Sequence, residues 1–331
     1  MPNFIKPFKN ISAKDVATAG GKGASLGEMS KAGIPVPPGF VILASAFEYF
    51  LDGKRQKAAS EIKQEIEAQL QRVNYQDTNS IDRASNVIRD IMQDTPMPKE
   101  LAAEIVVEFK KLKAPLVAVR SSATAEDSLV ASWAGELETY LNTTAKNLLD
   151  NVKRCWSSLF TPRAIFYRYE KKLSDQAVQV AVVVQAMVQS EISGIAFSAH
   201  PVTRDKNQMV IEAGWGLGEA IVSGQITPDT YVIDKPRTRI NSARGKQDFS
   251  IIDINVSEQK RMLVKKINGG IIWKAVPKAK QNKQVLSGKQ IIELARMVDK
   301  IEKRYHKPQD IEWAYAGGKF YITQSRPITT L

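Results

Sequence analysis

Cysteine is almost absent from this chain of 331 residues, because Cys155 is the only one. A single cysteine excludes an internal disulfide framework, so we expect a reducing, cytoplasmic environment. Cys155 also lies on an apolar helical stripe with Leu148, Val152 and Leu159. This spacing predicts a buried core thiol rather than a nucleophile.

Long apolar runs are missing as well. The longest apolar-rich stretch, 177–188, is interrupted by glutamine and is too short to span a bilayer. The first ten residues contain no apolar segment of signal-peptide length. We therefore expect no membrane partner.

Acidic residues are outnumbered, since 47 Lys and Arg against 35 Asp and Glu give a formal charge of +12. Much of the excess lies in 235–246 and 260–280. Such stretches are typical of a solvated basic surface or of an anionic partner. No zinc-finger spacing or RNP-type aromatic motif accompanies them, which argues against nucleic acid. Small phosphorylated ligands fit at least as well, and a solvated face is the default interpretation.

Apolar periodicity predicts a mixed α+β fold. Helical spacing covers 58–113, 145–172 and 288–305. Short apolar runs predict strands at 116–119, 179–188, 194–198, 208–213 and 229–234, and a terminal hairpin over 310–327. No proline-rich or glycine/serine-rich linker divides the chain, so we expect one domain with two lobes.

The first glycine-rich stretch is GGKG at 20–23. Glycine lets backbone N–H groups approach a phosphate, and Lys22 adds a positive charge. The Walker A and dinucleotide templates both fail, because the chain has Val16, Gly23 and Leu26 where they need other residues. A glycine-rich turn that opens a short helix remains, with an ordinary loop as the alternative.

A second candidate is VAVRSSATAEDS, in which Arg120 ends a predicted strand and hydroxyl side chains follow within 121–124. An arginine with neighbouring hydroxyls offers a bidentate donor and neutral donors to phosphate oxygens. Glu126 and Asp127 could tether Arg120 or hold a metal. The alternative is that the serines cap a turn.

The terminal hairpin offers Glu312 and Gln324 as oxygen ligands, and Mg²⁺ between nucleotide phosphates needs only one or two of these. By strand alternation Gln324 shares a face with Arg326. A plain two-residue turn at 317–318 would set Ile311 opposite Gln324. A shared metal therefore requires an odd-length loop or a bulge. The other face would carry Ile311, Trp313 and Tyr315.

Taken together, several stretches resemble the nucleotide-binding domain shared by phosphoenolpyruvate synthase, pyruvate phosphate dikinase and rifamycin phosphotransferase. They occur in the family's order and are GGKGASLGEMSKAGIPVPPGF, VAVRSSATAEDS, SWAGELETYLN, EAGWGLGEAIVSGQITPDTYVI and DIEWAYAGGKFYITQSRPIT. The resemblance implies an ATP-grasp-like nucleotide-binding domain over 1–331, with ATP held between lobes of approximately 1–185 and 186–331.

The same resemblance implies a set of site residues. Lys22, Arg120 and Arg326 would be catalytic and would grip phosphates. Glu312 and Gln324 would hold Mg²⁺ and contact ATP. The remaining ATP-binding residues would be Gly135, Thr139, Gln185, Met187 and Val188.

The implied reaction is transfer of a phosphoryl group from ATP to a histidine on a separate domain or subunit, ultimately converting pyruvate to phosphoenolpyruvate. Neither His200 nor His306 lies in the glycine-rich Cys-His setting of the family's carrier histidine. We therefore expect the carrier and acceptor domains to be absent from this chain. A rifamycin phosphotransferase-type antibiotic kinase and a non-catalytic nucleotide-binding module are the alternatives.

Overall fold

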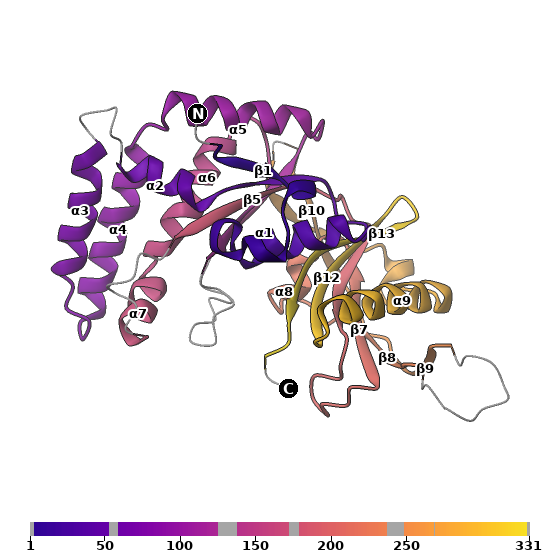
Figure 1. Ribbon diagram of the computed structural model, residues 1–331. Coiled ribbons are helices and arrows are strands. Elements are labelled where there is room, and N and C mark those ends of the chain that lie inside the picture. The colour runs from indigo at the N-terminus through magenta and orange to yellow at the C-terminus, as the bar shows by residue number, and fades with distance from the viewer. Residues whose placement is uncertain are drawn as a thin grey trace. The chain divides into compact units, whose positions relative to one another are not determined.

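The protein has the predicted α+β composition, with two units that each contain an antiparallel sheet (Figure 1). The computed structural model describes residues 3–52, 59–124, 138–171, 179–236, 248–267 and 269–329. The first unit comprises Met1–Lys31 and Pro38–Met187, and the second comprises Ala32–Pro37 and Val188–Leu331. Within these described ranges, no helix has the length and apolar character needed to cross a membrane.

The first unit is built on a five-stranded sheet in the order β1-β2-β5-β3-β4. Its strands are β1 (Ile5–Pro7), β2 (Gly39–Ile42), β3 (Val117–Ala123), β4 (Thr139–Thr143) and β5 (Val180–Ala186). Arg120 lies within β3, because the pairing with β5 continues to Ala123. The prediction that Arg120 ends its strand is therefore wrong.

Helices cover one face of this sheet and bury every second strand residue against it. They are α2 (Ala44–Asp52), α3 (Ala59–Gln71), α4 (Thr78–Asp94), α5 (Lys99–Lys111), α6 (Leu148–Ser157) and α7 (Pro162–Glu170). Short 3-10 turns occur at Phe8–Asn10, Ala13–Asp15 and Ser158–Phe160. Cys155 is fully buried in this core, and burial raises the pKa of its thiol, so the predicted core role is confirmed.

The second unit is built on a six-stranded antiparallel sheet in the order β13-β12-β6-β7-β8-β9. Its strands are β6 (Ile192–Phe197), β7 (Gln208–Trp215), β8 (Asp229–Asp234), β9 (Ser250–Asn255), β12 (Gln309–Ala316) and β13 (Lys319–Pro327). The predicted helix α9 (Gly288–Tyr305) packs on β7, β9 and β12. Its apolar stripe Ile291, Leu294, Val298 and Ile301 is buried, as predicted.

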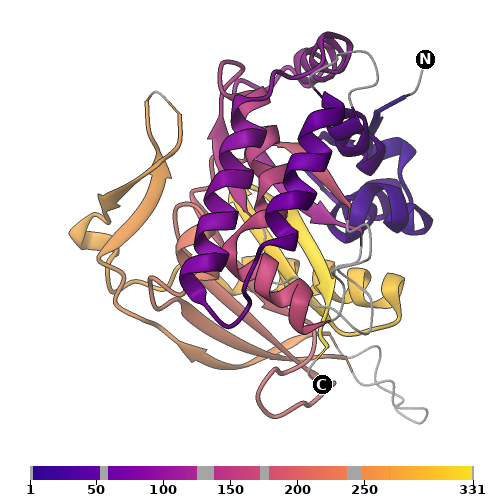
Figure 2. The same ribbon diagram turned by 90° about the vertical axis from the view of Figure 1, so that its left-hand side faces the viewer.

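The basic stretch 260–280 folds largely as a hairpin of β10 (Arg261–Lys265) and β11 (Ile271–Ala275), which Figure 2 shows standing apart from the six-stranded sheet. The short helices α8 (Glu219–Val222) and η4 (Lys278–Lys280) complete the unit. The N–H of Leu217 donates to the carbonyl oxygen of Leu263 at 2.9 Å and ties the hairpin to the preceding loop. Gly216 has a φ of +83°, and a Cβ there would lie 2.4 Å from the Leu263 carbonyl oxygen, so the contact requires glycine.

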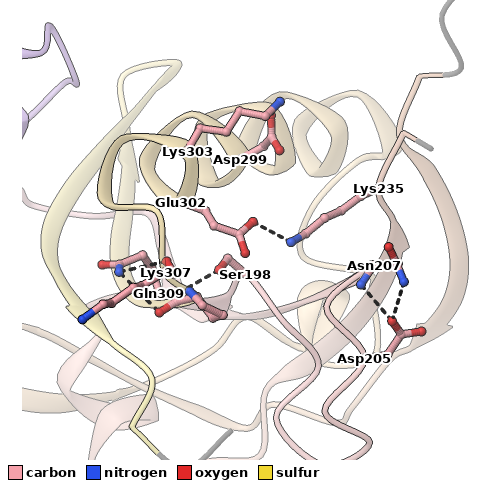
Figure 3. A network of polar contacts seen from close by, with 10 residues as sticks. Ser198, Asp205, Asn207, Lys235, Asp299, Glu302, Lys303, Lys307 and Gln309 are labelled. Carbon is pink, nitrogen blue, oxygen red and sulfur yellow. Dashed lines mark hydrogen bonds and ion pairs between the residues drawn. The ribbon is translucent and has the colours of Figure 1, made fainter. Parts of the chain in front are cut away.

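Polar contacts join the last turns of α9 to the residue after β8, and the start of β12 to the residue after β6 (Figure 3). The Nζ of Lys235 lies 2.5 Å from Oε2 of Glu302, with both side chains mostly buried. The backbone N–H of Gln309 donates to Oγ of Ser198 at 2.8 Å, and Oγ of Ser325 donates to Oε1 of Gln309 at 2.8 Å. Lys235 therefore stabilises the unit, although its position in the basic stretch 235–246 favoured a surface role.

Candidate functional site

The GGKG stretch forms a break inside a longer helix, α1 (Val16–Lys31). Gly20 has φ 70° and ψ 168°, and helical residues lie on both sides of it. The sequence predicted a turn that opens a helix, and the structure adds a helical turn before it. Because the helix restarts after Gly20, the segment carrying Lys22 begins with backbone N–H groups directed out of the helix end.

Ser122 on β3 stabilises this break through two hydrogen bonds. The N–H of Gly23 donates to Oγ of Ser122 at 3.3 Å, and the same hydroxyl donates to the carbonyl oxygen of Ala19 at 3.0 Å. A Cβ on Gly20 would lie 2.2 Å from Oγ of Ser122, so only glycine permits this approach. The first unit thus packs the turn that carries Lys22 directly on β3.

Several predicted residues lie on that same face of the first sheet. Val117 and Val119 point into the helical core, so by alternation Arg120 and Ser122 point to the opposite face. Arg120 pairs across the sheet with Thr139, and the Ala118–Gln185 pair places Gln185 on this face too. The structure therefore gathers Arg120, Thr139, Gln185 and the Lys22 turn on one face of one sheet.

Arg120 and Gln185 are buried, with 8% and 2% of their surfaces exposed. Within the described part of the chain, Nε2 of Gln185 has no hydrogen-bond partner. An unsatisfied buried amide donor carries a cost in free energy that an acceptor on a ligand would offset. Other buried atoms of the described residues, such as Nε1 of Trp156 in the helical core, also have no partner, so it is the position of Gln185 on the same face as Arg120 that suits a polar ligand.

The remaining predicted residues lie elsewhere. Met187 follows β5, with its N–H donating to the Leu116 carbonyl oxygen at 3.0 Å, and it ends the first unit. Val188 is the next residue and belongs to the second unit. Gly135, Glu126 and Asp127 lie outside the described residues.

In the second unit, Glu312 lies directly opposite Gln324. The strands connect through a two-residue turn, because Ala316 pairs with Lys319, and the register then shifts between Glu312 and Trp313. The bulge that a shared metal would require is therefore present, and the odd-length loop is not used. Ile311 and Trp313 are buried on the other face, as predicted, whereas Tyr315 is only half-buried.

Arg326 is paired across the hairpin with Asp310, which sequence reasoning missed. Its Nε and Nη2 lie 2.9 Å and 2.8 Å from Oδ2 of Asp310. Burial raises the pKa of Asp310, Arg326 partly opposes this rise, and the charge of Glu312 adds to it. Asp310 could have been found from alternation, since it stands two residues before Glu312 on one strand.

Glu212 on β7 is a second carboxylate that the sequence did not reveal. It pairs with Ile195, which in turn pairs with Glu312, so Glu212 and Glu312 share a face of the sheet. Burial raises the pKa of Glu212, and the charge of Asp310 raises it further. Only the strand order brings these carboxylates together, so no local signal could have identified Glu212.

The chemistry of the Glu312–Gln324 pair fits Mg²⁺. A carboxylate and an amide carbonyl are hard oxygen ligands, and Mg²⁺ bound with phosphates needs few ligands from the protein. Among the residues that the structure describes, no group of three or more His, Cys, Asp or Glu side chains could hold a metal. The pair would therefore need oxygens from a ligand to complete the coordination.

Both histidines lie in turn or cap positions. Nδ1 of His200 accepts the backbone N–H groups of Val202 and Thr203, each at 3.3 Å. His306 ends α9 in the left-handed conformation, with φ 54°. Nδ1 of His200 is therefore engaged in its own turn, whereas His306 is exposed at the end of α9.

In the first unit, the helix that restarts at the glycine break suits an anion, and in the second unit the carboxylate–amide pair suits a divalent cation. Residues 16–331 match the family described as "Pyruvate phosphate dikinase, AMP/ATP-binding domain". The chain belongs to this family.

Curated relatives support the same assignment. The chain is 43% identical to a probable phosphoenolpyruvate synthase of Methanocaldococcus jannaschii and 42% identical to the phosphoenolpyruvate synthase of Pyrococcus furiosus, in each case over 99% of its length. It is 36% identical over its full length to the rifampicin phosphotransferase of Bacillus subtilis. It spans 27%, 44% and 36% of these relatives, respectively, so each contains a large part without a counterpart here.

Proposed function

We propose that this chain is the ATP-binding part of a phosphoenolpyruvate synthase-like dikinase. It would bind Mg-ATP in an ATP-grasp arrangement and transfer a phosphoryl group to a histidine on a separate domain or subunit, ultimately for the conversion of pyruvate to phosphoenolpyruvate. The observation that carries this proposal is the gathering of Arg120, Thr139, Gln185 and the Lys22 turn on one sheet face, in a chain of an AMP/ATP-binding family.

Each residue has a role that follows from its chemistry. Arg120 presents a planar fork that suits two phosphate oxygens, and Lys22 supplies a mobile positive charge. The unsatisfied Nε2 of Gln185 would donate to an acceptor nitrogen of adenine. Together these contacts would position the nucleotide and neutralise its phosphate charge, which accounts for most of the catalysis in phosphoryl transfer.

In the second unit, Glu312 and Gln324 would hold Mg²⁺, which when bound neutralises phosphate charge and orients the transferring group. Arg326 would contact phosphate. Since Asp310 accepts a hydrogen bond from Nε of Arg326 and forms an ion pair with its Nη2, we propose that Asp310 aligns Arg326 for that contact. Thr139, Met187 and Val188 would line the remainder of the ATP site.

The phosphoryl acceptor would be a histidine outside these residues, because His200 caps a turn and His306 ends a helix. The relatives are much longer than this chain, and their additional residues are sufficient for such a domain and for an acceptor site. Pyruvate is favoured over an antibiotic as final acceptor, because identity to the synthases is 43% and 42% but to the rifampicin phosphotransferase is 36%.

Titration calorimetry on the full chain tests the proposal. ATP should bind with Mg²⁺ and bind more weakly when EDTA removes the metal, whereas a single-stranded oligonucleotide should give no saturable heat. A chain that binds neither ATP nor ADP with Mg²⁺, or that binds only the oligonucleotide, would contradict it.

A further inference from the structure

The hydroxyl of Ser122 replaces one backbone hydrogen bond of helix α1. In an uninterrupted α-helix the N–H of residue 23 would bond to the carbonyl oxygen of residue 19. Here Oγ of Ser122, a residue with 0% exposure, lies between these two groups, accepting from Gly23 at 3.3 Å and donating to Ala19 at 3.0 Å. A side chain inserted into the hydrogen-bond ladder is a recognised cause of a helix kink.

Ser122 connects the structural elements that carry two of the cationic residues proposed to contact phosphate, Lys22 and Arg120. Ser122 stands two residues after Arg120 on β3 and on the same face, while its hydroxyl binds the break that carries Lys22. The break and the strand are 103 residues apart along the chain at the Ala19 contact. Within the first unit this is a direct bond between the Lys22 turn and the Arg120 strand.

We infer that Ser122 is a positioning residue for phosphoryl transfer: its hydroxyl keeps α1 broken at Gly20, and thereby holds Lys22 and the restarted helix where they can act on phosphate together with Arg120. The inference rests on the proposed function. Ser122 need not touch the nucleotide, because it acts through the turn.

Loss of the hydroxyl has a defined structural consequence. Without it, the Gly23 N–H and Ala19 carbonyl would be buried without their shared partner. They can satisfy each other only if Gly20 leaves its φ of 70° and α1 becomes continuous. A continuous helix has no N-terminus at GGKG, and the Lys22 side chain changes direction relative to β3.

The test compares three variants of the full chain by calorimetry with Mg-ATP and with adenosine. Ser122→Ala should weaken Mg-ATP binding about 10- to 100-fold, because charge-assisted contacts to the phosphates are misplaced. Adenosine lacks phosphates, so its affinity should stay within about twofold. The matched control is Ser121→Ala, since Ser121 is a buried neighbour whose Oγ donates to the Glu138 carbonyl oxygen at 3.0 Å on the opposite face.

A double variant separates positioning from stability. Gly20→Ala with Ser122→Ala excludes the broken helix, because a Cβ at position 20 would lie 2.3 Å from the backbone carbonyl oxygen of residue 122 there, and alanine favours a continuous helix. Mg-ATP binding should therefore stay weak even if the melting temperature rises above that of Ser122→Ala. If Ser122→Ala alone does not fold, the Mg-ATP affinity of this double variant tests the positioning role of Ser122 instead.

Two results would overturn the inference while the proposed function stands: Ser122→Ala binding Mg-ATP like Ser121→Ala, or the double variant regaining affinity together with stability. A wild-type chain that does not bind Mg-ATP would instead refute the proposed function, and the inference with it.

Discussion

Replacement of Arg120 by lysine should weaken Mg-ATP binding much more than it lowers the stability of the fold. Arg120 lies in the middle of β3 and is only 8% exposed, and lysine retains its charge and its aliphatic stem. We therefore expect a stability change of about 1 kcal/mol or less, which lowers the melting temperature of a unit of this size by roughly 2–4 °C. An ammonium cannot reproduce two parallel bonds to phosphate oxygens.

The functional loss should be much larger than the loss of stability. One charge-assisted hydrogen bond contributes about 1.5–3 kcal/mol, so Mg-ATP affinity should fall roughly 10- to 100-fold. If Arg120 also stabilises the transferring phosphoryl group, turnover with an added histidine domain should fall by about 10³-fold or more, as for other arginines in phosphoryl transfer.

Lys153→Met is the matched control, because Lys153 is also 8% exposed and lies in the same unit. Its Nζ donates to the carbonyl oxygens of Gln93 and Thr95 at the end of α4, the latter at 3.2 Å. Methionine leaves both carbonyls without this donor, at a cost of about 1.5–3 kcal/mol, so the melting temperature should fall by roughly 3–12 °C. Mg-ATP affinity should not change.

Differential scanning calorimetry and titration calorimetry on the two variants measure both quantities. The reasoning would be refuted if Arg120→Lys lowered the melting temperature as much as Lys153→Met and left Mg-ATP affinity unchanged. Arg120 would then have a structural role.

Three further predictions concern the metal, the pH dependence and the reaction. Glu312→Gln should raise the Mg²⁺ concentration needed for half-maximal ATP binding by about tenfold or more, while the affinity for adenosine should not change. Identical Mg²⁺ titrations of variant and wild type would show that Glu312 is not a metal ligand. Because burial raises the pKa of Glu212 above its usual 4.5, the folded state holds this proton more tightly, so the free energy of unfolding should fall as pH rises through the range just above 4.5. Glu212→Gln should reduce that decline in thermal melts across the acidic range without removing it, because burial raises the pKa of Asp310 as well, and an unaltered profile would assign the decline to other groups. The chain alone, given Mg-ATP and pyruvate, should form no phosphoenolpyruvate by enzyme-coupled assay, and product formation would show that an acceptor histidine lies within it.

Local features could be predicted from the sequence because they depend on neighbours along the chain. The helices within 58–113 and at 288–305 follow from apolar residues at helical spacing, and α9 has the predicted bounds. Either a bulge or an odd-length loop in the terminal hairpin could be predicted on the hypothesis that Glu312 and Gln324 share a metal, since a two-glycine turn with regular pairing would place them on opposite faces, and the structure has the bulge. The order of motifs was sufficient to indicate the family, which the comparisons confirm.

Other features were decided only by tertiary structure. The bond from Ser122 to the GGKG break joins residues about a hundred positions apart, and Glu212 comes to share a face with Glu312 only because β6 lies between β7 and β12. The segment 32–37 belongs to the second unit, where the Pro35 carbonyl oxygen accepts the N–H of Ile322 at 2.9 Å. Periodicity specifies which face of an element is apolar, but it does not specify which strands become neighbours, since that choice depends on how all the apolar faces are buried together.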